Sequence, residues 1–437
     1  MNHVTIVGGG LAGCEAALQL ADRGVPVHLY EMRPGTATGA HRGDRLGEIV
    51  CSNSFKSTRL DNASGLLKAE MNRLGCQLLE IARGCSVPAG HALGIDRELF
   101  ADGVTRRVES HSHVRVTREE IHSIDVPGEV VFCTGPLTGN ALARDMQRHS
   151  GDNLYFYDAI APSLDGDSIA DGTGFWASRY GKGGDDYLNI PFDRDDYRKL
   201  LETIRSADIV KSHDFEEEKY FEACLPIEVL AARGDDVLRY GPMKPRGLID
   251  PATGREPYAV LQLRQESRSG NLLGMVGFQT RMTWPAQKHM VRSFPGMDGV
   301  RLLRYGTIHR NMFLNTPALC TRWLRDSRRT MVHYAGQICG VEGYVESIMS
   351  AMVVAFDILA NRRGMPLTPI PCDTMIGALM KYVHTPNANF QPMNGNMGIM
   401  PRPTVPRRDR RQRNEGISAI ALASVDAWKK ENDHLFA

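Results

Sequence analysis

The sequence HVTIVGGGLAGCEAALQLADRGVPVHLYEM, residues 3–32, decides the fold. Its pattern predicts a short buried strand over residues 3–7, a glycine loop, a helix that ends at Gly24, and an apolar strand over residues 25–32. Strand, loop, helix and strand in this order form the βαβ unit that binds dinucleotides in doubly wound α/β proteins. The chain is therefore expected to begin with a nucleotide-binding domain.

The loop has the spacing Gly8-x-Gly10-x-x-Gly13. Gly8 suits the tight turn, Gly10 lets the backbone approach a phosphate, and Gly13 lets the helix pack closely on the strand. The unpaired N–H groups at the helix N-terminus attract a pyrophosphate. Glu31 follows Gly13 by 18 positions, where an acidic residue accepts hydrogen bonds from the adenosine ribose. The loop alone leaves FAD, NAD and S-adenosylmethionine open.

Two later segments favour FAD. FCTGP (132–136) and HYAGQICGVEGY (333–344) each place a glycine, Gly135 or Gly336, after a buried strand. The second segment also opens a helix, whose N-terminus suits the ribityl and pyrophosphate part of a flavin nucleotide. The alternative is that both are ordinary strand–turn units of a parallel sheet.

The length of 437 residues indicates two or three domains. Residues 155–320 alternate Gly/Pro turns with short β-rich runs, whereas strand–turn–helix patterns precede and follow them. We expect an α/β fold: a Rossmann-type, glutathione-reductase-like FAD-binding domain in two parts (1–154 and 321–437), split by an inserted α+β substrate domain (155–320). Substrates would then meet in the crevice between the domains.

The composition limits the partners and the cellular location that we expect for the protein. Lys and Arg total 52 against 51 for Asp and Glu, so overall charge argues neither for nor against a nucleic-acid partner. The nine cysteines are scattered without a CxxC pair, which argues against a disulfide framework or a metal site. No signal peptide is evident, and the longest apolar helix candidate, 348–360, is too short to span a bilayer. A cytoplasmic protein without a membrane or metal partner is expected.

Several longer blocks carry a family resemblance. They are VGGGLAGCEAA (7–17), EIVCSNS (48–54), GLLKAEM (65–71), CTGPLT (133–138), YFEACLPIE (220–228), YGPMKPRGLIDPATGREPYAVLQLRQE (240–266), VGFQT (276–280), YGTIHRNMFLN (305–315) and AGQICGVEGYVES (335–347). Together they resemble the folate- and FAD-dependent tRNA (uracil-5-)-methyltransferases, within the GidA-like flavoproteins.

The resemblance implies a reaction and its partners. Reduced FAD takes a one-carbon unit from 5,10-methylenetetrahydrofolate and passes it to carbon-5 of a uridine in the tRNA T-loop, with NADH or NADPH as the source of electrons. The cofactor contacts that it implies, together with the glycine loops, are Gly8, Gly10, Leu11, Ala12, Gly13, Glu31, Arg33, Gly135, Gly336, Gly340, Val341, Gly343 and Tyr344.

Two cysteines are candidates for the chemistry. Carbon-5 of uracil is a poor nucleophile until a group adds to carbon-6, and a thiolate is the usual adding group. The resemblance points to Cys51 and Cys224, one as nucleophile and the other as base or partner, with Cys51 slightly favoured for the covalent step. The apolar surroundings of four others indicate core positions: Cys14, Cys76, Cys133 and Cys339.

Two segments combine an aromatic residue, an arginine and a histidine, GFQTRMTW (277–284) and GTIHRNMF (306–313). A folate offers a flat pterin for stacking and carboxylates for arginine. The candidates for folate or flavin contact are Arg281, Trp284, His309 and Arg310, with Asn396 and Tyr344 as weaker ones. Packing at a domain interface is the alternative.

The segment PRPTVPRRDRRQR (401–413) holds six arginines and one aspartate. Such a run suits phosphate contacts without base specificity. A solvated face or loose tail gives the same pattern, so the tRNA partner rests on the resemblance.

Other functions remain open. A relative acting on ribosomal RNA and a GidA-type enzyme for tRNA wobble uridines share the fold, and the blocks around Cys51 and Cys224 argue only against the second. An RNA-binding flavoprotein with structural FAD is the non-enzymatic alternative. A flavin disulfide oxidoreductase lacks its cysteine pair, and the later glycine turns disfavour an S-adenosylmethionine methyltransferase. The oligomeric state and the choice between NADH and NADPH are left open.

Overall fold

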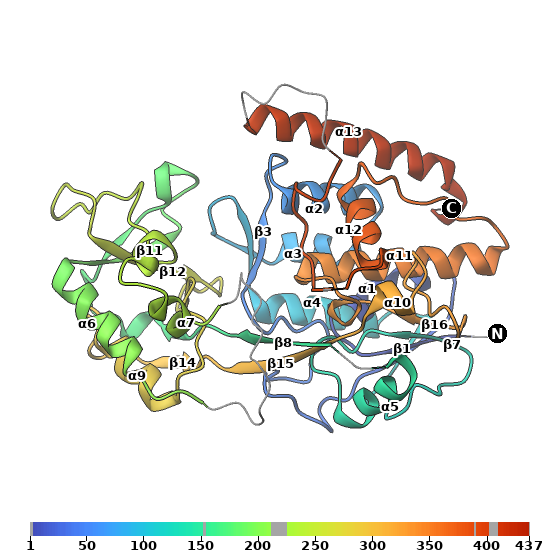
Figure 1. Ribbon diagram of the computed structural model, residues 1–437, viewed down its shortest axis with the longest axis horizontal. Coiled ribbons are helices and arrows are strands. Elements are labelled where there is room, and N and C mark those ends of the chain that lie inside the picture. The colour runs from blue at the N-terminus through green and yellow to red at the C-terminus, as the bar shows by residue number, and fades with distance from the viewer. Residues whose placement is uncertain (1–2, 152–153, 211–224, 389, 402–409, 437) are drawn as a thin grey trace.

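The computed structural model describes residues 3–151, 154–210, 225–388, 390–401 and 410–436. The molecule has two bodies (Figure 1). The large body carries both termini and contains the elements from β1 (Val4–Val7) to α5 (Asn140–Ser150) and from α10 (Thr316–Leu319) to the C-terminus. The small body contains those from β9 (Ser163–Asp165) to β14 (Leu302–Arg304). A ribbon of two antiparallel strands joins the bodies, β8 (Leu154–Ala159) and β15 (Ile308–Phe313).

A five-stranded parallel sheet forms the centre of the large body, in the order β16-β7-β1-β2-β6. Its strands are β1 (Val4–Val7), β2 (Val27–Tyr30), β6 (Val114–Thr117), β7 (Glu129–Phe132) and β16 (Val332–Tyr334). Each neighbouring pair is parallel, so all carboxyl ends point to one edge of the sheet. The predicted α/β, Rossmann-type fold is confirmed.

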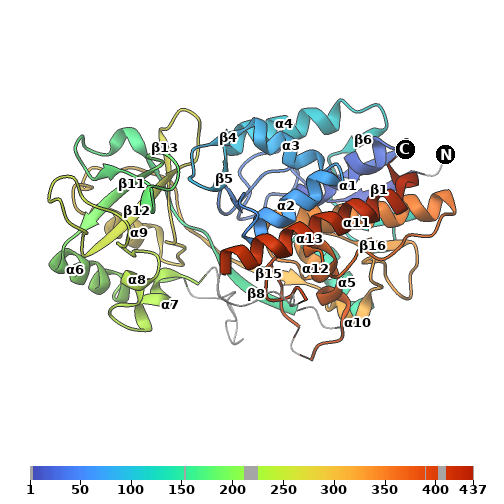
Figure 2. The same cartoon turned by 90° about the horizontal axis from the view of Figure 1, so that it is seen from above.

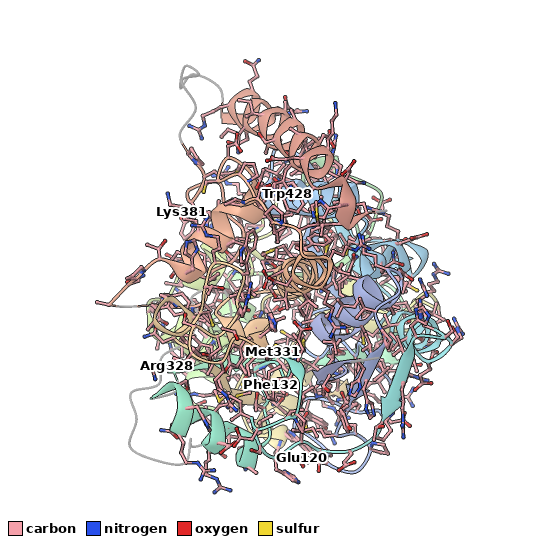
Figure 3. The ribbon with its side chains drawn as sticks, turned by 90° about the vertical axis from the view of Figure 1, so that its right-hand side faces the viewer. Glu120, Phe132, Arg328, Met331, Lys381 and Trp428 are labelled. Atoms are coloured by element: carbon pink, nitrogen blue, oxygen red, sulfur yellow. The ribbon has the colours of Figure 1, made fainter. Side chains whose placement is uncertain are left out.

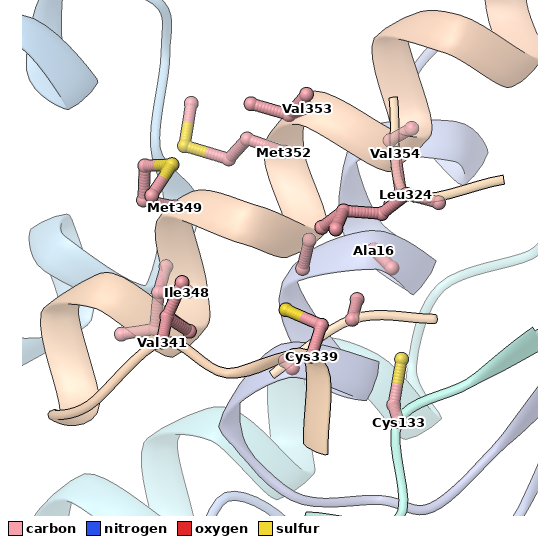
Figure 4. Close-up of a cluster of buried hydrophobic side chains, with 14 of the residues drawn as sticks. Ala16, Cys133, Leu324, Cys339, Val341, Ile348, Met349, Met352, Val353 and Val354 are labelled. Carbon is pink, nitrogen blue, oxygen red and sulfur yellow. The ribbon is translucent and has the colours of Figure 1, made fainter. Parts of the chain in front are cut away.

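Helices α1 (Leu11–Ala21) and α11 (Tyr344–Arg363) pack against each other beside this sheet (Figure 4). Every residue of α1 is buried, as expected for a helix between a parallel sheet and another helix. Helix α11 is long and apolar enough to cross a membrane by composition, but 89% of its apolar window is buried inside the molecule. It is therefore a core helix.

Further helices cover the large body: α2 (Ala63–Arg73), α3 (Gln77–Gly84), α4 (Arg97–Glu109), α5 (Asn140–Ser150), α10 (Thr316–Leu319), α12 (Met375–His384) and α13 (Arg410–Glu431). A small antiparallel sheet accompanies them, β3 (Ser54–Ser57), β5 (Ala92–Ile95) and β4 (Ser86–Val87). Asp96 caps α4, since its carboxylate accepts hydrogen bonds from the N–H groups of Glu98 and Leu99.

Helix α13 was not predicted from the sequence. It runs alongside α2 (Figure 2), where the Ser418 hydroxyl donates to the Leu60 carbonyl and the Trp428 indole donates to the Thr368 carbonyl. Residues 410–413 thus form the first turn of a packed helix, and the idea of a loose tail is wrong for this part of the basic run. Residues 402–409 lie outside the described residues.

The small body is an antiparallel sheet in the order β10-β11-β12-β13-β9-β14, with helices packed on it. Its elements are β9 (Ser163–Asp165), β10 (Phe175–Trp176), β11 (Tyr187–Phe192), α6 (Arg194–Arg205), α7 (Ile227–Ala232), α8 (Val237–Tyr240), β12 (Ala259–Gln265), β13 (Leu272–Met275), α9 (Trp284–Arg292) and β14 (Leu302–Arg304). It has a hydrophobic core separate from that of the large body. Strand β13 ends at Met275, and Gly277 then turns the chain at φ +78°.

Candidate active site

A cleft opens at the carboxyl edge of the parallel sheet and encloses about 1030 Å³, including space open to solvent. Figure 3 labels Phe132, which ends β7, and Glu120, which lines the cleft. Ligands of open α/β sheets bind at this edge. Nine of the predicted cofactor residues line it: Gly8, Gly10, Leu11, Ala12, Glu31, Arg33, Gly135, Gly336 and Tyr344.

The glycine loop shows why each glycine is needed. A Cβ on Gly13 would lie 1.8 Å from the Gly8 carbonyl oxygen, and a Cβ on Gly8 would lie 2.6 Å from the Cys133 carbonyl oxygen. A Cβ on Gly10 would meet no atom within 4 Å, so only a ligand would contact it there. Gly10 also leaves the N-terminus of α1 without a side-chain cap, which keeps its N–H groups free for a phosphate.

Glu31 ends up buried at the end of β2 beside this loop. Its carboxylate accepts hydrogen bonds from Gly9 N–H at 2.9 Å and from Arg33 Nε at 2.8 Å. Burial alone would raise the pKa of Glu31, but the hydrogen bonds and charge of Arg33 hold that pKa below its ordinary value. Arg33 also pairs with Glu48 at 2.8 Å, so it is fixed between two carboxylates. The anionic Glu31 is suited to accept from ribose hydroxyls.

The second and third glycine turns face the same cleft. Gly135 has φ +64° and Gly336 has φ +88°, conformations that favour glycine. A hydrogen bond between the hydroxyls of Thr134 and Thr138 at 2.7 Å holds the first turn. Ser350 Oγ accepts from Gly336 N–H at 2.8 Å and holds the second.

Gly340, Val341 and Gly343 do not line the cleft. A Cβ on Gly340 would lie 2.3 Å from the ring of Phe390, so this glycine is required for packing. The Val341 side chain is fully buried in the hydrophobic core (Figure 4), which leaves only its backbone for any ligand contact. Gly343 is the residue before α11 and has φ +117°.

These features fit a flavin dinucleotide. The open edge of Gly10 and the uncapped start of α1 would take the pyrophosphate, and Glu31 the adenosine ribose. The remaining part of the cleft extends past the turns at Gly135 and Gly336 to Tyr344.

Cys51 lies at the border of this cleft, between the two bodies. Its N–H donates to the Tyr344 hydroxyl at 2.7 Å, and both Tyr344 and Val50 line the cleft. The Cys51 side chain is partly exposed. The nucleophile candidate is therefore next to the cofactor cleft.

Arg97 binds the backbone of the loop that carries Cys51. Its guanidinium donates to the carbonyl oxygens of Ile49 at 2.9 Å and Cys51 at 2.5 Å, and to the Glu266 carboxylate at 2.9 Å. Arg97 and Glu266 are both buried. Burial alone would raise the pKa of Glu266, but Arg97 holds it below its ordinary value.

Arg264 reaches the same loop from β12. It donates to Ser52 Oγ and to Asn53 Oδ1, both at 2.8 Å, while the Asn53 side chain donates to the Gln265 carbonyl at 3.0 Å. The small body thus takes part directly in holding the Cys51 loop.

The remaining predicted site residues lie in different parts of the chain, and some are outside the described residues. Cys224 lies outside the described residues, and so do the side chains of His309 and Arg310. Trp284 is 60% exposed on the small body and stacks on Tyr305 at a centroid distance of 5.1 Å.

Arg281 is partly buried three positions before Trp284, and its carbonyl oxygen accepts from Val210 N–H at 2.8 Å. The side chain of Asn396 forms hydrogen bonds with Met393, Asn394 and Gly398 of its own loop. Four cysteines predicted to be core residues are indeed buried: Cys14, Cys76, Cys133 and Cys339.

Sequence reasoning missed the charged residues around Cys51: Arg97, Arg264, Glu266 and Arg304. One signal was present. In YAVLQLRQE the polar residues Gln262, Arg264 and Glu266 alternate with leucines, which puts them on one face of a strand. Nothing in the sequence near Arg97 or Arg304 marked them.

Comparison with known proteins gives a consistent result. The model of the family described as glucose inhibited division protein A matches residues 3–366. The chain is 47% identical over 434 residues to methylenetetrahydrofolate–tRNA-(uracil-5-)-methyltransferase TrmFO of Geobacter sp. (strain M21), covering 98% of this chain and 99% of the relative. Proteins of the same name from Aquifex aeolicus (44%, 98% and 97% covered) and Dictyoglomus thermophilum (48%, 98% of each covered) match equally fully.

Among solved structures, two crystal forms of Aquifex aeolicus GidA share the fold. Form II has a TM-score of 0.68 at 16% identity, over 99% of this chain and 75% of the other. Form I has a TM-score of 0.66 at 16% identity, over 98% and 76%.

Proposed function

Because the chain belongs to the glucose inhibited division protein A family, and within it to the methylenetetrahydrofolate–tRNA-(uracil-5-)-methyltransferases, we propose that it methylates carbon-5 of a T-loop uridine in tRNA. The observation that carries this proposal is the position of Cys51, at the edge of a cleft shaped for FAD. The close relatives favour this activity over the modification of wobble uridines.

The overall reaction balances with NADH or NADPH as reductant. The methylene carbon of 5,10-methylenetetrahydrofolate and a hydride from the nicotinamide become the methyl group. Carbon-5 of the uridine loses its proton, and this proton together with one from solvent balances the two N–H groups of the tetrahydrofolate that is released with the oxidised nicotinamide. FAD, when bound, supplies the redox chemistry that links the two substrates.

The residues that would hold FAD are those of the cleft. The N-terminus of α1 after Gly10 would bind the pyrophosphate, Glu31 and Arg33 would border the adenosine, and Gly135, Gly336 and Tyr344 would border the flavin half. On the far side, Trp284 and Arg281 from the small body are proposed folate or flavin contacts, together with His309 and Arg310.

The two cysteines would activate the uracil. Addition of the Cys51 thiolate to carbon-6 makes carbon-5 nucleophilic. After the carbon–carbon bond forms, a base removes the carbon-5 proton, and the electron pair restores the 5,6 double bond and expels the Cys51 thiolate. We assign that second role, as base or partner, to Cys224. Arg97 and Tyr344 hold the backbone of the Cys51 loop during this sequence.

We assign cofactor binding to one body and substrate binding to the other. Residues 1–154 and 321–437 would bind FAD and residues 155–320 would receive substrate. Two separate hydrophobic cores support a division into two bodies, with residues 312–314, 319 and 320 packed in the core of the large one. The arginines between 402 and 413 would contact tRNA phosphates. Cysteines that carry no disulfide in the described part of the chain, such as Cys14, Cys85 and Cys372, support a reducing, cytoplasmic setting.

The test uses the FAD-loaded protein with an unmodified tRNA transcript, methylenetetrahydrofolate and NADH or NADPH. Mass spectrometry of the digested RNA should find 5-methyluridine, and mapping should place it in the T-loop. Cys51→Ala should abolish the product, while Cys372→Ala, which removes an exposed thiol, should not. A Cys51→Ala enzyme of full activity would refute the role of Cys51, and methylation of ribosomal RNA alone would refute the tRNA target.

A further inference from the structure

Four arginines gather around the Cys51 loop, and we call them the arginine cluster: Arg42, Arg97, Arg264 and Arg304. Two come from the large body and two from the small one. Arg97 and Arg264 make the contacts with residues 49–53 described above. Arg304 donates to the Val50 carbonyl at 3.3 Å, and Arg42 donates to the Leu303 carbonyl at 3.2 Å.

The four guanidinium groups carry more positive charge than the neighbouring carboxylates neutralise. Within the described residues, Arg97 alone among the four forms an ion pair, with Glu266. The side chains of the other three donate only to neutral carbonyl, hydroxyl or amide oxygens. Glu48 is ion-paired with Arg33, and among the described residues it accepts from the backbone N–H groups of Arg42 and Gly43 but not from the Arg42 side chain.

The repulsion among these positive charges affects the pKa of Arg304. Burial and the positive charges of Arg97 and Arg42 lower its pKa to about 10, against partial compensation by Glu266. Burial, in first place, also lowers the pKa of Arg42 and of Arg264, and Arg97 adds to the effect at both. An anion placed among these guanidinium groups would relieve the repulsion.

We propose that the arginine cluster binds a phosphate group of the RNA strand next to the reacting uridine. This inference rests on the proposed function. A uridine whose carbon-6 reaches Cys51 must leave its stack, and its own phosphates would then lie close to the loop that the arginine cluster surrounds. The planar guanidinium fork matches phosphate oxygens in pairs. The whole chain has a net charge of only +1, so local attraction of this kind would have to hold the strand.

Arg304 is the residue with which to test the inference. Its one hydrogen bond to the Cys51 loop is the longest that the cluster makes there, so its replacement leaves the bonds of Arg97 and Arg264 in place. Arg301 provides a matched control: it lies three positions away, its side chain is 67% exposed, and it is paired with Asp165.

The experiment measures binding of an unmodified T-arm hairpin to the FAD-loaded protein at several KCl concentrations. Arg304→Gln should weaken binding about tenfold and reduce the slope of log affinity against log salt by about one. Arg304→Lys should keep the slope. The KM for methylenetetrahydrofolate and the FAD content should stay at wild-type values, and Arg301→Gln should match wild type throughout.

Two results would overturn the inference. One is an Arg304→Gln protein with wild-type hairpin affinity and salt slope. The other is an increased KM for methylenetetrahydrofolate with hairpin binding intact, which would assign the cluster to the folate carboxylates. Because binding is measured without turnover, the proposed reaction can fail separately: no 5-methyluridine from wild type, but a salt-dependent loss in Arg304→Gln, would refute the reaction and leave the phosphate site standing.

Discussion

At the scale of single residues, the position of Cys51 depends on its backbone partners. Its N–H donates to the Tyr344 hydroxyl and its carbonyl accepts from Arg97, so the loop is fixed on both sides of the thiol. Tyr344 begins α11 and also lines the cofactor cleft. A cofactor that contacts Tyr344 would therefore contact the residue that positions the nucleophile.

Tyr344→Phe tests this coupling. The variant leaves the Cys51 N–H without its acceptor, a cost of about 1–3 kcal/mol. We expect kcat for 5-methyluridine formation to fall roughly tenfold or more, since 1.36 kcal/mol corresponds to a factor of ten, with FAD content unchanged. Tyr382→Phe is the control, because the Tyr382 hydroxyl donates to the Gln391 carbonyl away from the cleft. Equal kcat values for the two variants would contradict the positioning role.

Lys68 offers a second residue-scale prediction. It is buried, and its ammonium donates to the carbonyls of Phe55 at 2.7 Å and Ser64 at 2.8 Å. Burial lowers the pKa of Lys68 to about 7, Glu346 opposes the shift and Lys56 adds to it. Between that value and the ordinary 10.5, the unfolded chain holds a proton that the folded chain lacks, so stability rises with pH across this window.

The comparison is with Lys68→Met. The free energy of unfolding of wild type relative to the variant should increase from pH 7 to pH 9, at up to about 1.4 kcal/mol per pH unit. Urea unfolding of both proteins at the two pH values measures the difference. Parallel pH dependences would show that Lys68 remains charged in the folded protein.

At the scale of elements, two glycines at the start of α1 have different roles, one in folding and the other in cofactor binding. Gly13 is required by the protein itself, because its Cβ would overlap the Gly8 carbonyl, whereas the space beside Gly10 is open to a ligand. Gly10→Ala should therefore fold normally but lose most of its FAD. Gly13→Ala should fold poorly. Flavin absorbance per protein and the thermal midpoint distinguish the two, and a Gly10→Ala protein with full FAD content would contradict this assignment of the loop.

Elements with local signals could be predicted from the sequence, and α13 could not. The glycine loop and the Asp96 cap each follow from a few neighbouring residues. Helix α13 begins with charged residues and has no clear amphipathic pattern, and its position depends on contacts with residues far away in the sequence, such as Leu60 and Thr368. Tertiary packing of this kind leaves little trace in local periodicity.

At the scale of the whole molecule, the Cys51 loop is built by both bodies. Glu266 and Arg264 of the small body meet Arg97 and residues 49–53 of the large body. The sequence indicated the cysteine, but the charged groups around it come from positions as distant as 42 and 304, which only the fold brings together. The cleft was therefore predictable and the arginine cluster was not.

Glu266→Gln tests this junction. It leaves the buried charge of Arg97 without a carboxylate, which costs about 3–5 kcal/mol of stability. Because Arg97 holds the pKa of Glu266 below its ordinary value, this contribution is present above pH 4.5 and is lost as the pH falls through the lowered pKa. Denaturant unfolding at pH 7 measures the loss.

The exposed pair Arg246–Glu256 of the small body supplies the control. Glu256→Gln should change stability by no more than about 0.5 kcal/mol. If Glu266→Gln were equally mild, the two bodies would not depend on the Arg97–Glu266 pair.

The origin of the methyl carbon tests the central claim most directly. The FAD-loaded protein is given unmodified tRNA, NADH or NADPH, and 5,10-methylenetetrahydrofolate carrying carbon-13 in its methylene group, with unlabelled S-adenosylmethionine also present. The account predicts 5-methyluridine from the T-loop that carries the label. Unlabelled 5-methyluridine, or none at all from a protein with full FAD content, would contradict it.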